Sequence, residues 1–539
     1  GNFRARPYTP RGPMGVVEIV LVLMVAVAAL ALLAHKLNIP YPILLVLGGL
    51  GFALAPGLPK VRLDPELVFF FVLPPLLYPA ALFTSWRDFR ANARPIALLA
   101  IGLVLFTTVF VAWVAHALMG LPWAAGFVLG AIVSPPDAVA ATAITERLRV
   151  PRRIVTVIEG ESLVNDATAL VAYRFAIMAM TTGTFSLSQA SGKFLLAATG
   201  GTAIGLAVGW LATQIQRRLD DPPVQITISL LTPFASYLPA DRLGLSGVLA
   251  VVSTGIYVGW RSPEILNARL RLQAWPVWEM IVFLLNGLIF ILIGLQLPEV
   301  MKNLAGEPKS TLLWHAAVVC AAVILIRILW VFPGTYLPRW VSPMIRKCDP
   351  APNWRWVAIV AWTGMRGVVS LAAAMALPLT MPDGSPFPGR DLILFLTFSV
   401  ILATLVVQGF TLPPLIRWLG VVDDGEHERE ERKARLKANQ AALARLSELE
   451  AAAETEALTR LRLEYEDRIR QLEMNEISGE TARHRVHRGD YEGLLRETLT
   501  IERQVILQLR NEQVINDAVL RRIQRDLDFA EGRLSNTFE

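Results

Sequence analysis

Long apolar runs recur along the chain from Val16 to Trp418 and then stop. Each run is about 18 to 25 residues long, the length of helix that crosses a bilayer. The runs are too continuous for the alternation of apolar and polar positions that a membrane β-barrel needs. The pattern therefore predicts an all-α polytopic membrane protein with about 13 transmembrane helices. The predicted spans are centred on residues 15–36, 40–57, 66–84, 95–118, 121–144, 152–180, 192–216, 223–239, 243–260, 273–297, 311–333, 353–378 and 391–416.

The first apolar run is expected to stay in the protein as a membrane helix. Its apolar core reaches Leu33 and is followed by His35 and Lys36 without a clear cleavage site, unlike a signal peptide. Residues 1–13 are predicted to be an N-terminal extension with no part in the fold. Residues 14–420 then form the transmembrane domain.

A different composition begins after Gly420. Residues 421–539 are rich in Glu, Arg, Leu and Ala, with opposite charges three or four positions apart. Such spacing stabilises exposed helices, so we expect a helical hairpin or coiled coil whose second run covers about 481–530. The tail is either a solvated, weakly regulatory segment or a module that stabilises a dimer or senses pH. The histidines that would respond to pH are His427, His484 and His487.

Composition agrees with a membrane protein. Hydrophobic residues make up 54% of the chain and charged residues only 18%, which places most of the chain in lipid. The two cysteines and six scattered histidines favour neither a disulfide framework nor a thiolate or HExxH metal site. The net charge of +6 is explained by basic loops, so it does not indicate a nucleic-acid partner.

The loop charges predict the orientation. Alternate loops between the predicted spans hold 17 Lys and Arg residues on one side and 7 on the other. Because basic loops stay in the cytoplasm, the first set is predicted to be cytoplasmic, and the tail lies with it. The expected location is a cell membrane.

Charged residues inside the apolar runs are the best functional clues. A charge at mid-bilayer costs about 2.5 to 3.5 kcal/mol even on a lenient scale, so it usually faces a protein interior or a wet cavity. The charged residues in or near the spans are Glu18, Asp137, Glu159, Glu161, Asp166, Arg174, Glu279, Arg327 and Arg366.

The span 152–180 holds the densest cluster, in "EGESLVNDATAL". Ser162 and Asp166 are four residues apart, as are Glu161 and Asn165, so each pair shares a helix face. Hydroxyl, amide and carboxylate oxygens suit a hard cation such as Na⁺ or Li⁺. We expect Asp166 to be the exchangeable site, with Glu159 as an approach residue.

The preceding span contains "GAIVSPPDAVAATAI". Pro135 and Pro136 remove two backbone donors, so the helix should break near Ser134 and restart near Asp137. Broken helices at mid-membrane are how secondary transporters build ion sites. Asp137 and the Pro136 carbonyl are therefore predicted to join Ser162 and Asp166 around a monovalent cation. A kink that only shapes packing is the alternative.

Arg366, in "WTGMRGVVSLAAA", needs a partner at membrane depth because an unpaired buried charge is strongly destabilising. Glu161 is the predicted partner, in a structural ion pair without a role in ion binding. The flanking Gly364 and Gly367 allow close helix approach or local unwinding. Arg327 and Glu279 are expected to pair likewise.

Three segments, "SPPDAVA", "GESLVNDA" and "GMRGVVSLA", resemble in order and spacing the monovalent cation:proton antiporters of the sodium/proton exchanger type, including the bacterial NhaP-like members. The resemblance covers about Val16 to Gly420. It implies two inverted repeats with broken crossing helices, a homodimer, and an ion site between a dimerisation domain and a mobile core.

The resemblance also implies roles for individual residues. Asn165 and Asp166 match the family's Asn-Asp pair, Asp137 its acid on the broken helix, and Ser162 its coordinating serine. The bracing Glu-Arg pair matches Glu161 and Arg366. Two positions depart from the family: Ala138 stands where relatives often have Pro, and Pro136 where they often have Thr or Val, which removes a side-chain ligand.

Residues and resemblance together predict a secondary transporter that exchanges Na⁺ or Li⁺ for H⁺ by alternating access. Asp166 would bind either ion, never both, and the neutral Asn165 beside it favours electroneutral one-for-one exchange. The expected role is pH and sodium homeostasis in a bacterial inner (plasma) membrane, with membrane lipid as surroundings and no cofactor beyond the transported ions. K⁺/H⁺ exchange is the nearest alternative, because the same ligands permit it.

Other classes are less well supported. "EGES" falls short of a GxSxG elbow and no HExxH occurs, so the sequence does not predict an enzyme. A cation channel, or a sensor that signals through the tail, is the remaining alternative.

Overall fold

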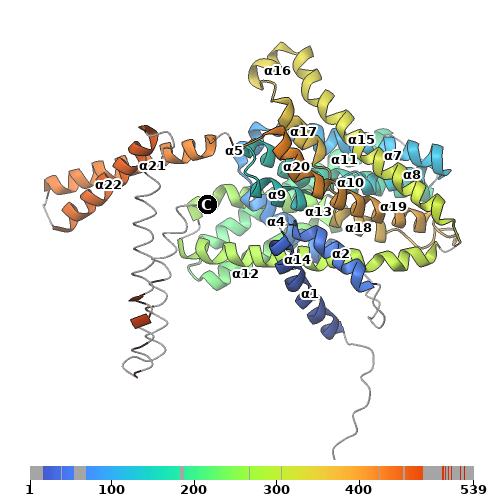
Figure 1. Cartoon of the computed structure of the whole chain (residues 1–539), viewed down its shortest axis with the longest axis horizontal. Coiled ribbons are helices and arrows are strands. Elements are labelled where there is room, and N and C mark those ends of the chain that lie inside the picture. The colour runs from blue at the N-terminus through green and yellow to red at the C-terminus, as the bar shows by residue number, and fades with distance from the viewer. Residues whose placement is uncertain are drawn as a thin grey trace, which may run out of the picture. The chain divides into compact units, whose positions relative to one another are not determined.

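The computed structural model of the 539-residue chain is built from helices (Figure 1). It describes residues 16–37, 39–53, 68–182, 187–265, 268–304, 306–423, 425–452, 456–477 and a few positions between 501 and 527. The predicted N-terminal extension and most of the second helical run of the tail lie outside these residues. Contacts divide the chain into two compact units, Gly1–Asp424 and Gly425–Glu539.

The helices of the first unit follow the predicted apolar runs. Its first half contains α1 (Val16–Leu37), α2 (Tyr41–Ala53), η1 (Val68–Val72), α4 (Leu73–Phe83), α5 (Trp86–Ala91), α6 (Ala93–Ala97), η2 (Leu98–Leu103), α7 (Val104–Met119), α8 (Trp123–Val133), α9 (Ala138–Arg147), α10 (Arg152–Thr182) and α11 (Leu187–Gln216). Its second half contains α12 (Pro222–Arg242), α13 (Gly247–Ile265), α14 (Ala268–Asn303), α15 (Lys309–Val341), α16 (Pro343–Cys348), α17 (Trp354–Trp362), α18 (Val368–Met375), α19 (Arg390–Ala403), η3 (Thr404–Gln408) and α20 (Gly409–Leu419).

These helices make a multi-pass membrane protein. In the part of the chain that the structure describes, eight helices are long and apolar enough to cross a bilayer, and 41–53 and 68–83 are shorter apolar helices. The all-α polytopic class is therefore confirmed, and the predicted spans at 223–239 and 243–260 are helices α12 and α13. The count of 13 and the inverted repeats stay predictions.

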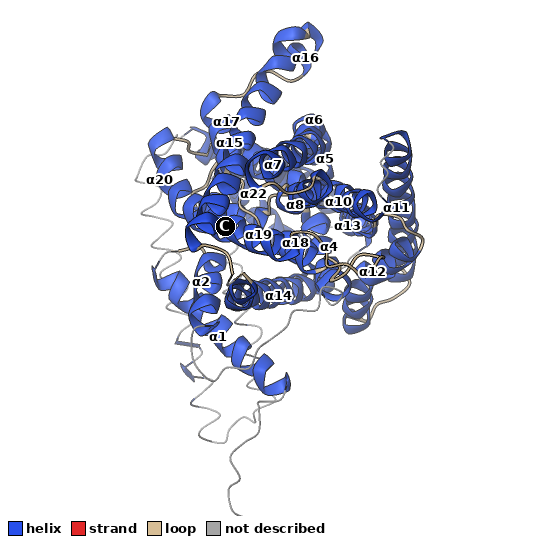
Figure 2. Ribbon diagram, turned by 90° about the vertical axis from the view of Figure 1, so that its right-hand side faces the viewer, coloured by secondary structure: helices blue, strands red, loops and turns tan. Residues whose placement is uncertain are grey.

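Two sets of helices pack around the centre of this unit. In one set, α14 lies along α2, and α13 packs against α4, α11 and α12. In the other, α8 packs against α7 and α10, and α15 against α17 and α19 (Figure 2). The contact between α2 and α14 is very close, because a Cβ at Gly49 would lie 2.1 Å from the Ile291 carbonyl oxygen. Small residues of this kind let membrane helices pack backbone to backbone.

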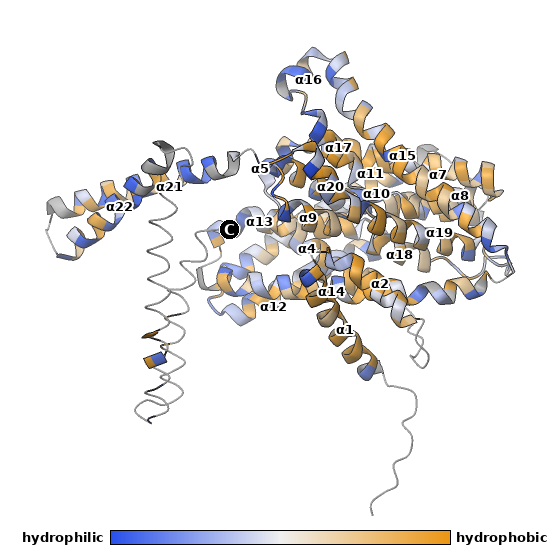
Figure 3. Cartoon of the chain, in the orientation of Figure 1, coloured by the Kyte–Doolittle hydropathy of each residue, from blue (hydrophilic) through white to orange (hydrophobic). Residues whose placement is uncertain are grey.

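The second unit has a different surface. Its helices α21 (Glu426–Ala452) and α22 (Glu456–Ile477) pack against each other and are far more hydrophilic than the first unit (Figure 3). Exposed ion pairs join residues four apart, such as Arg435 with Glu431 and Arg462 with Glu466. The predicted helical tail is thus confirmed over α21 and α22, whereas a coiled coil between two chains stays a prediction.

Candidate ion-binding site

Two interrupted helices meet at the centre of the first unit. The chain leaves helical geometry between α8 and α9, at Ser134–Asp137, and again between α17 and α18, at Thr363–Gly367. The backbone N–H of Asp137 donates a 2.7 Å hydrogen bond to the carbonyl of Met365, so the two unwound segments touch. The predicted break at Pro135–Pro136 is confirmed.

Asp137 lies at the starts of α9 and α18, the two helices that follow the breaks. One carboxylate oxygen, Oδ1, accepts a 2.9 Å hydrogen bond from the Val139 N–H and so caps α9. The other, Oδ2, lies against Gly367 at the start of α18, where a Cβ would come within 1.7 Å of it. A carboxylate is favoured there because helix N-termini carry partial positive charge.

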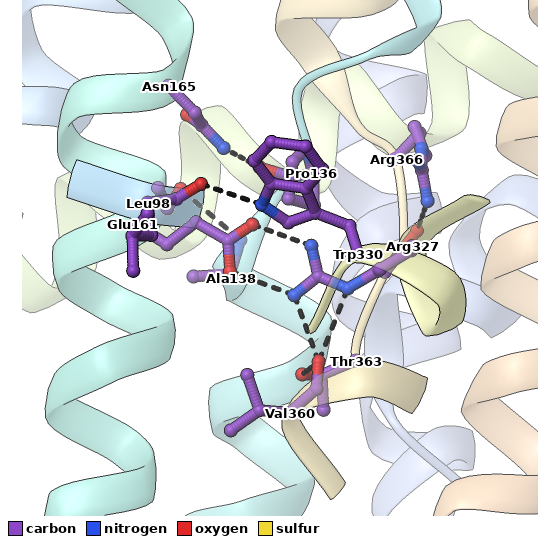
Figure 4. A network of polar contacts seen from close by, with 12 residues as sticks. Leu98, Pro136, Ala138, Glu161, Asn165, Arg327, Trp330, Val360, Thr363 and Arg366 are labelled. Carbon is purple, nitrogen blue, oxygen red and sulfur yellow. Dashed lines mark hydrogen bonds and ion pairs between the residues drawn. The ribbon is translucent and has the colours of Figure 1, made fainter. Parts of the chain in front are cut away.

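Helix α10 presents its polar residues to the first break. Asn165, which is fully buried, donates from Nδ2 to the Pro136 carbonyl at 2.7 Å (Figure 4). Ser162 Oγ accepts from the Ala138 N–H at 3.4 Å. Asp166 is 7% exposed and lies within electrostatic reach of Asp137. The structure thus brings together all five predicted site residues.

Oxygen atoms at this point are available to a cation. Asn165 Oδ1 is buried without a hydrogen-bond partner among the described residues. The Pro136 carbonyl has accepted one hydrogen bond and retains a second lone pair. Within the same described ranges, no group of three or more His, Cys, Asp or Glu side chains has the arrangement of a metal site. The donors that converge are instead mixed oxygens, which suit a small hard cation.

The predicted pairing of Glu161 with Arg366 is wrong. Both carboxylate oxygens of Glu161 are bonded by Arg327, Oε1 to Nη1 at 2.6 Å and Oε2 to Nη2 at 2.8 Å (Figure 4). Each side chain is only 1% exposed. The predicted pairing of Arg327 with Glu279 fails for the same reason, and Glu279 is exposed. The fork of the Arg327 guanidinium matches both oxygens of this one carboxylate, and Arg366 bonds backbone carbonyls instead.

Arg366 has a different set of partners. Its Nε donates to the carbonyl of Val133 at 3.0 Å, at the end of α8, and its Nη1 donates to the Gly364 carbonyl. Its backbone N–H donates to Thr404 Oγ1 at 3.1 Å. Arg366 therefore compensates the negative end of the first half-helix.

Arg327 does the same for the second interrupted helix. Besides bonding Glu161, it donates to the Val360 carbonyl from Nε at 3.2 Å and from Nη2 at 3.0 Å. Val360 lies in the last turn of α17, so the end of this half-helix also faces a guanidinium.

The other predicted membrane charges lie away from this centre. Arg174 forms a 2.7 Å surface ion pair with Asp241. Glu159 lies near Glu146 and Arg152. The loop charges predict that this end of α10 is the cytoplasmic one. Its role as an approach residue stays a prediction.

Known proteins resemble this chain over the same region. The sequence model of the family described as "Sodium/hydrogen exchanger, transmembrane" matches residues 21–418. The chain belongs to the sodium/hydrogen exchanger family. An uncharacterized Na⁺/H⁺ exchanger of Mycobacterium tuberculosis is 38% identical over 512 residues, which cover 93% of each chain.

Two further relatives of this exchanger are informative. A sodium, potassium, lithium and rubidium/H⁺ antiporter of Bacillus subtilis is 36% identical over 391 residues, 70% of this chain and 58% of that protein. The solved structure of the sodium/proton antiporter MjNhaP1 of Methanocaldococcus jannaschii has a TM-score of 0.60 at 20% identity and covers 75% of this chain and 98% of that one. The exchanger therefore has the NhaP1-like fold, and it is a membrane Na⁺/H⁺ antiporter rather than an enzyme.

Sequence reasoning missed two polar residues of this exchanger near the site. Tyr41, on α2, lies within electrostatic reach of Asp137 and close to Asn286 of α14, which is 1% exposed. In the sequence, each is a polar residue inside an apolar run. Neutral polar residues are common in membrane helices, so they indicate a site less clearly than a charged residue does.

Proposed function

We propose that this antiporter exchanges one Na⁺ or Li⁺ for one H⁺, with Asp166 as the group that binds either ion. The observation that carries the proposal is a contrast between two carboxylates. Among the described residues, Glu161 and Asp166 are the buried acids of the membrane unit. Glu161 is fully bonded by Arg327, whereas Asp166 has no ion-pair or hydrogen-bond partner in the described structure. An ionised carboxylate without a partner is costly to bury, so Asp166 must take up a proton or a cation.

The neighbouring residues support the binding of a cation when Asp166 is not protonated. Asn165 Oδ1, Ser162 Oγ, the Pro136 carbonyl and Asp137 supply oxygens around Asp166. Asp137 adds negative charge that favours a cation over an anion or a neutral ligand. Because Asn165 is neutral, one carboxylate exchanges one charge per cycle, and transport is electroneutral.

The decisive experiment is Asp166→Asn in proteoliposomes that report internal pH. Na⁺ addition should produce no pH change above that of empty vesicles, because asparagine binds neither a proton nor a cation strongly. The matched control is Asp241→Asn, which removes a carboxylate from a surface ion pair. The assignment is wrong if the Asp166→Asn protein exchanges at the rate of the unmodified protein.

K⁺/H⁺ exchange is a second candidate because the Bacillus subtilis relative is described as carrying sodium, potassium, lithium and rubidium. Oxygen donors bind all these ions, and selectivity depends on the size and rigidity of the site. The same vesicles, supplied in turn with Na⁺, Li⁺ and K⁺, measure the order of preference. A response to K⁺ as large as that to Na⁺ would establish the second candidate.

The remaining parts of the proposal concern the assembled protein. Exchange proceeds by alternating access in a homodimer of a bacterial plasma membrane, with the tail in the cytoplasm, and serves pH and sodium homeostasis. Light scattering of the detergent-solubilised protein measures the dimer. Electroneutrality is measured by imposing a membrane potential, which should leave the exchange rate unchanged.

A further inference from the structure

Three arginines converge on Asp349, the residue that ends the short helix α16. Asp349 Oδ1 bonds Arg153 Nη2 at 2.7 Å, and Asp349 Oδ2 bonds Arg339 Nη2 at 2.6 Å. Arg94 Nη1 lies further away, 3.3 Å from Oδ2. Helices far apart in the sequence, α6, α10 and α15, thus bring their guanidinium groups to one place.

The cluster has more positive than negative charge. Asp349 is the carboxylate that pairs with these three arginines among the described residues. Arg339 is almost saturated, since it also donates to the Asp349 and Thr335 carbonyls. Arg94 is not, because its Nη2 is buried without a hydrogen-bond partner in the described structure. A buried donor without a partner is uncommon and costly, so an acceptor that reached Arg94 would be favoured.

An apolar cavity lies directly beside these arginines. It has a volume of about 70 Å³ and is partly open. Arg94, Arg153 and Arg339 line one part of it, and mostly apolar side chains line the rest. The apolar lining includes Leu98, Val157, Trp330, Val331, Trp356 and Val360. A ligand that fits both parts has a negative head and an apolar body.

The surrounding surface is that of a helix end in a membrane. Trp340, next to Arg339, is 82% exposed, and Leu337 is 54% exposed. Exposed tryptophan at the end of an apolar helix is typical of the membrane interface, where phospholipid headgroups lie.

We propose that this pocket binds the headgroup of an anionic phospholipid. The phosphate accepts hydrogen bonds from Arg94 and Arg153, since guanidinium groups bind phosphate through paired donors. The start of the acyl region enters the cavity beside Trp330 and Val360, and the rest lies along the exposed face of α15. Basic pockets between membrane helices commonly hold such headgroups. The site is separate from the ion site, and the inference does not depend on which cation is carried.

The pocket also touches the elements that hold the ion site. Val360 lines the cavity, and its carbonyl is the acceptor of Arg327, which bonds Glu161. A lipid in the cavity therefore contacts the end of α17 directly. We expect it to stabilise the membrane unit.

The test is native mass spectrometry of the full-length protein with dioleoyl phosphatidylglycerol or dioleoyl phosphatidylcholine. The unmodified protein should retain phosphatidylglycerol in preference to phosphatidylcholine. Arg94→Gln should lower retention of phosphatidylglycerol about tenfold, through loss of a charge-assisted contact. Arg90→Gln, which removes an exposed charge from the neighbouring helix α5, is the control and should retain the lipid.

Gly334→Leu tests the apolar part without changing any charge. Gly334 lines the cavity, where a Cβ meets only Trp330 at 3.7 Å, so a larger side chain occupies the space of the lipid. It should also lower retention. Inorganic phosphate alone should not raise the thermal unfolding temperature, whereas phosphatidylglycerol should. Equal retention in Arg94→Gln and Arg90→Gln, equal retention of the two lipids, or full stabilisation by free phosphate would each overturn the proposal.

Discussion

Glu161 and Asp166 lie five residues apart on α10, and their surroundings give them opposite chemistry. Glu161 has a guanidinium on both oxygens, whereas Asp166 forms no ion pair with any of the residues that the structure describes. A permanently paired acid cannot exchange ions at low cost. An unpaired buried acid is stabilised by binding a proton or a cation, and this difference is the reason Asp166 rather than Glu161 is the proposed exchange site.

Glu161→Gln should destabilise the protein strongly, because Arg327 would stay buried without its counter-charge. Breaking one partner of a buried pair costs about 3 to 5 kcal/mol, so the thermal unfolding temperature in detergent should fall by many degrees. Glu161→Gln with Arg327→Met should recover part of the loss. Glu279→Gln, at the exposed position, should leave the unfolding temperature unchanged; a fall there instead of at Glu161 would contradict the observed pairing.

Gly367→Ala should abolish exchange although it adds only one methyl group. Its Cβ would lie 1.7 Å from Asp137 Oδ2, so the two unwound segments could not keep their contact. The measurement is Na⁺-driven proton movement per folded protein. Gly192→Ala, on α11 with nothing within 4 Å of the new Cβ, should transport normally. Normal transport in Gly367→Ala would show that the contact with Asp137 is not required.

At the scale of elements, the two interrupted helices are neutralised in the same way. The first half of each is bonded at its end by an arginine, and the second halves of both begin beside the same aspartate. Arg366 bonds the end of α8, Arg327 bonds the end of α17, and Asp137 lies at the starts of α9 and α18. The ends of four half-helices are therefore neutralised by three side chains. Without them, unpaired backbone groups and helix dipoles would face each other in the membrane.

Arg366→Lys should retain part of the exchange activity and Arg366→Gln very little. Lysine keeps the positive charge at the end of α8, which is worth up to about 2 kcal/mol in a partly buried setting. It cannot bond the Val133 and Gly364 carbonyls with one planar fork. Initial rates of both variants, corrected for folded protein, measure the difference. Equal rates would mean that the charge at this position does not support the α8 end.

The first break was predictable from the sequence and the second was not. Pro135 and Pro136 forbid a continuous helix, whereas the α17–α18 segment contains only Gly364 and Gly367, which permit unwinding without requiring it. That Ser162 and Asn165 would meet the first break was also predictable, because oxygen-bearing side chains recur at helical spacing on α10; that they bind an ion stays a prediction.

The partner of Glu161 could not be predicted for a related reason. Both Arg327 and Arg366 stood out as membrane charges, but the choice depends on which helix packs beside α10 at that depth. Spacing along the chain does not contain that information. In the structure, the unpaired backbone carbonyls at the ends of α8 and α17 each bond one arginine, Arg366 and Arg327 respectively, and of the two it is Arg327 that also bonds Glu161.

At the scale of the whole molecule, every residue of the proposed ion site lies in the first unit, and α21 and α22 lie in the second. Removal of residues 425–539 should therefore leave Na⁺/H⁺ exchange intact within about twofold, since no ion ligand and no helix-capping arginine is lost. Proteoliposome assays across a range of external pH measure both the rate and its pH profile. A folded truncated protein without exchange would show that the tail is required for transport.

The charges of the side chains around the two breaks nearly cancel. Two guanidinium groups, on Arg327 and Arg366, face the carboxylates of Glu161, Asp137 and Asp166, so the empty centre has one negative charge in excess. A proton or a Na⁺ ion on Asp166 cancels it. Moving a net charge through a low-dielectric interior is expensive, whereas moving a neutral centre is not. In the mechanism proposed for Asp166, the carrier would therefore reorient readily with a proton or a cation bound and only at high energetic cost with neither, which would limit leakage of one ion without exchange of the other.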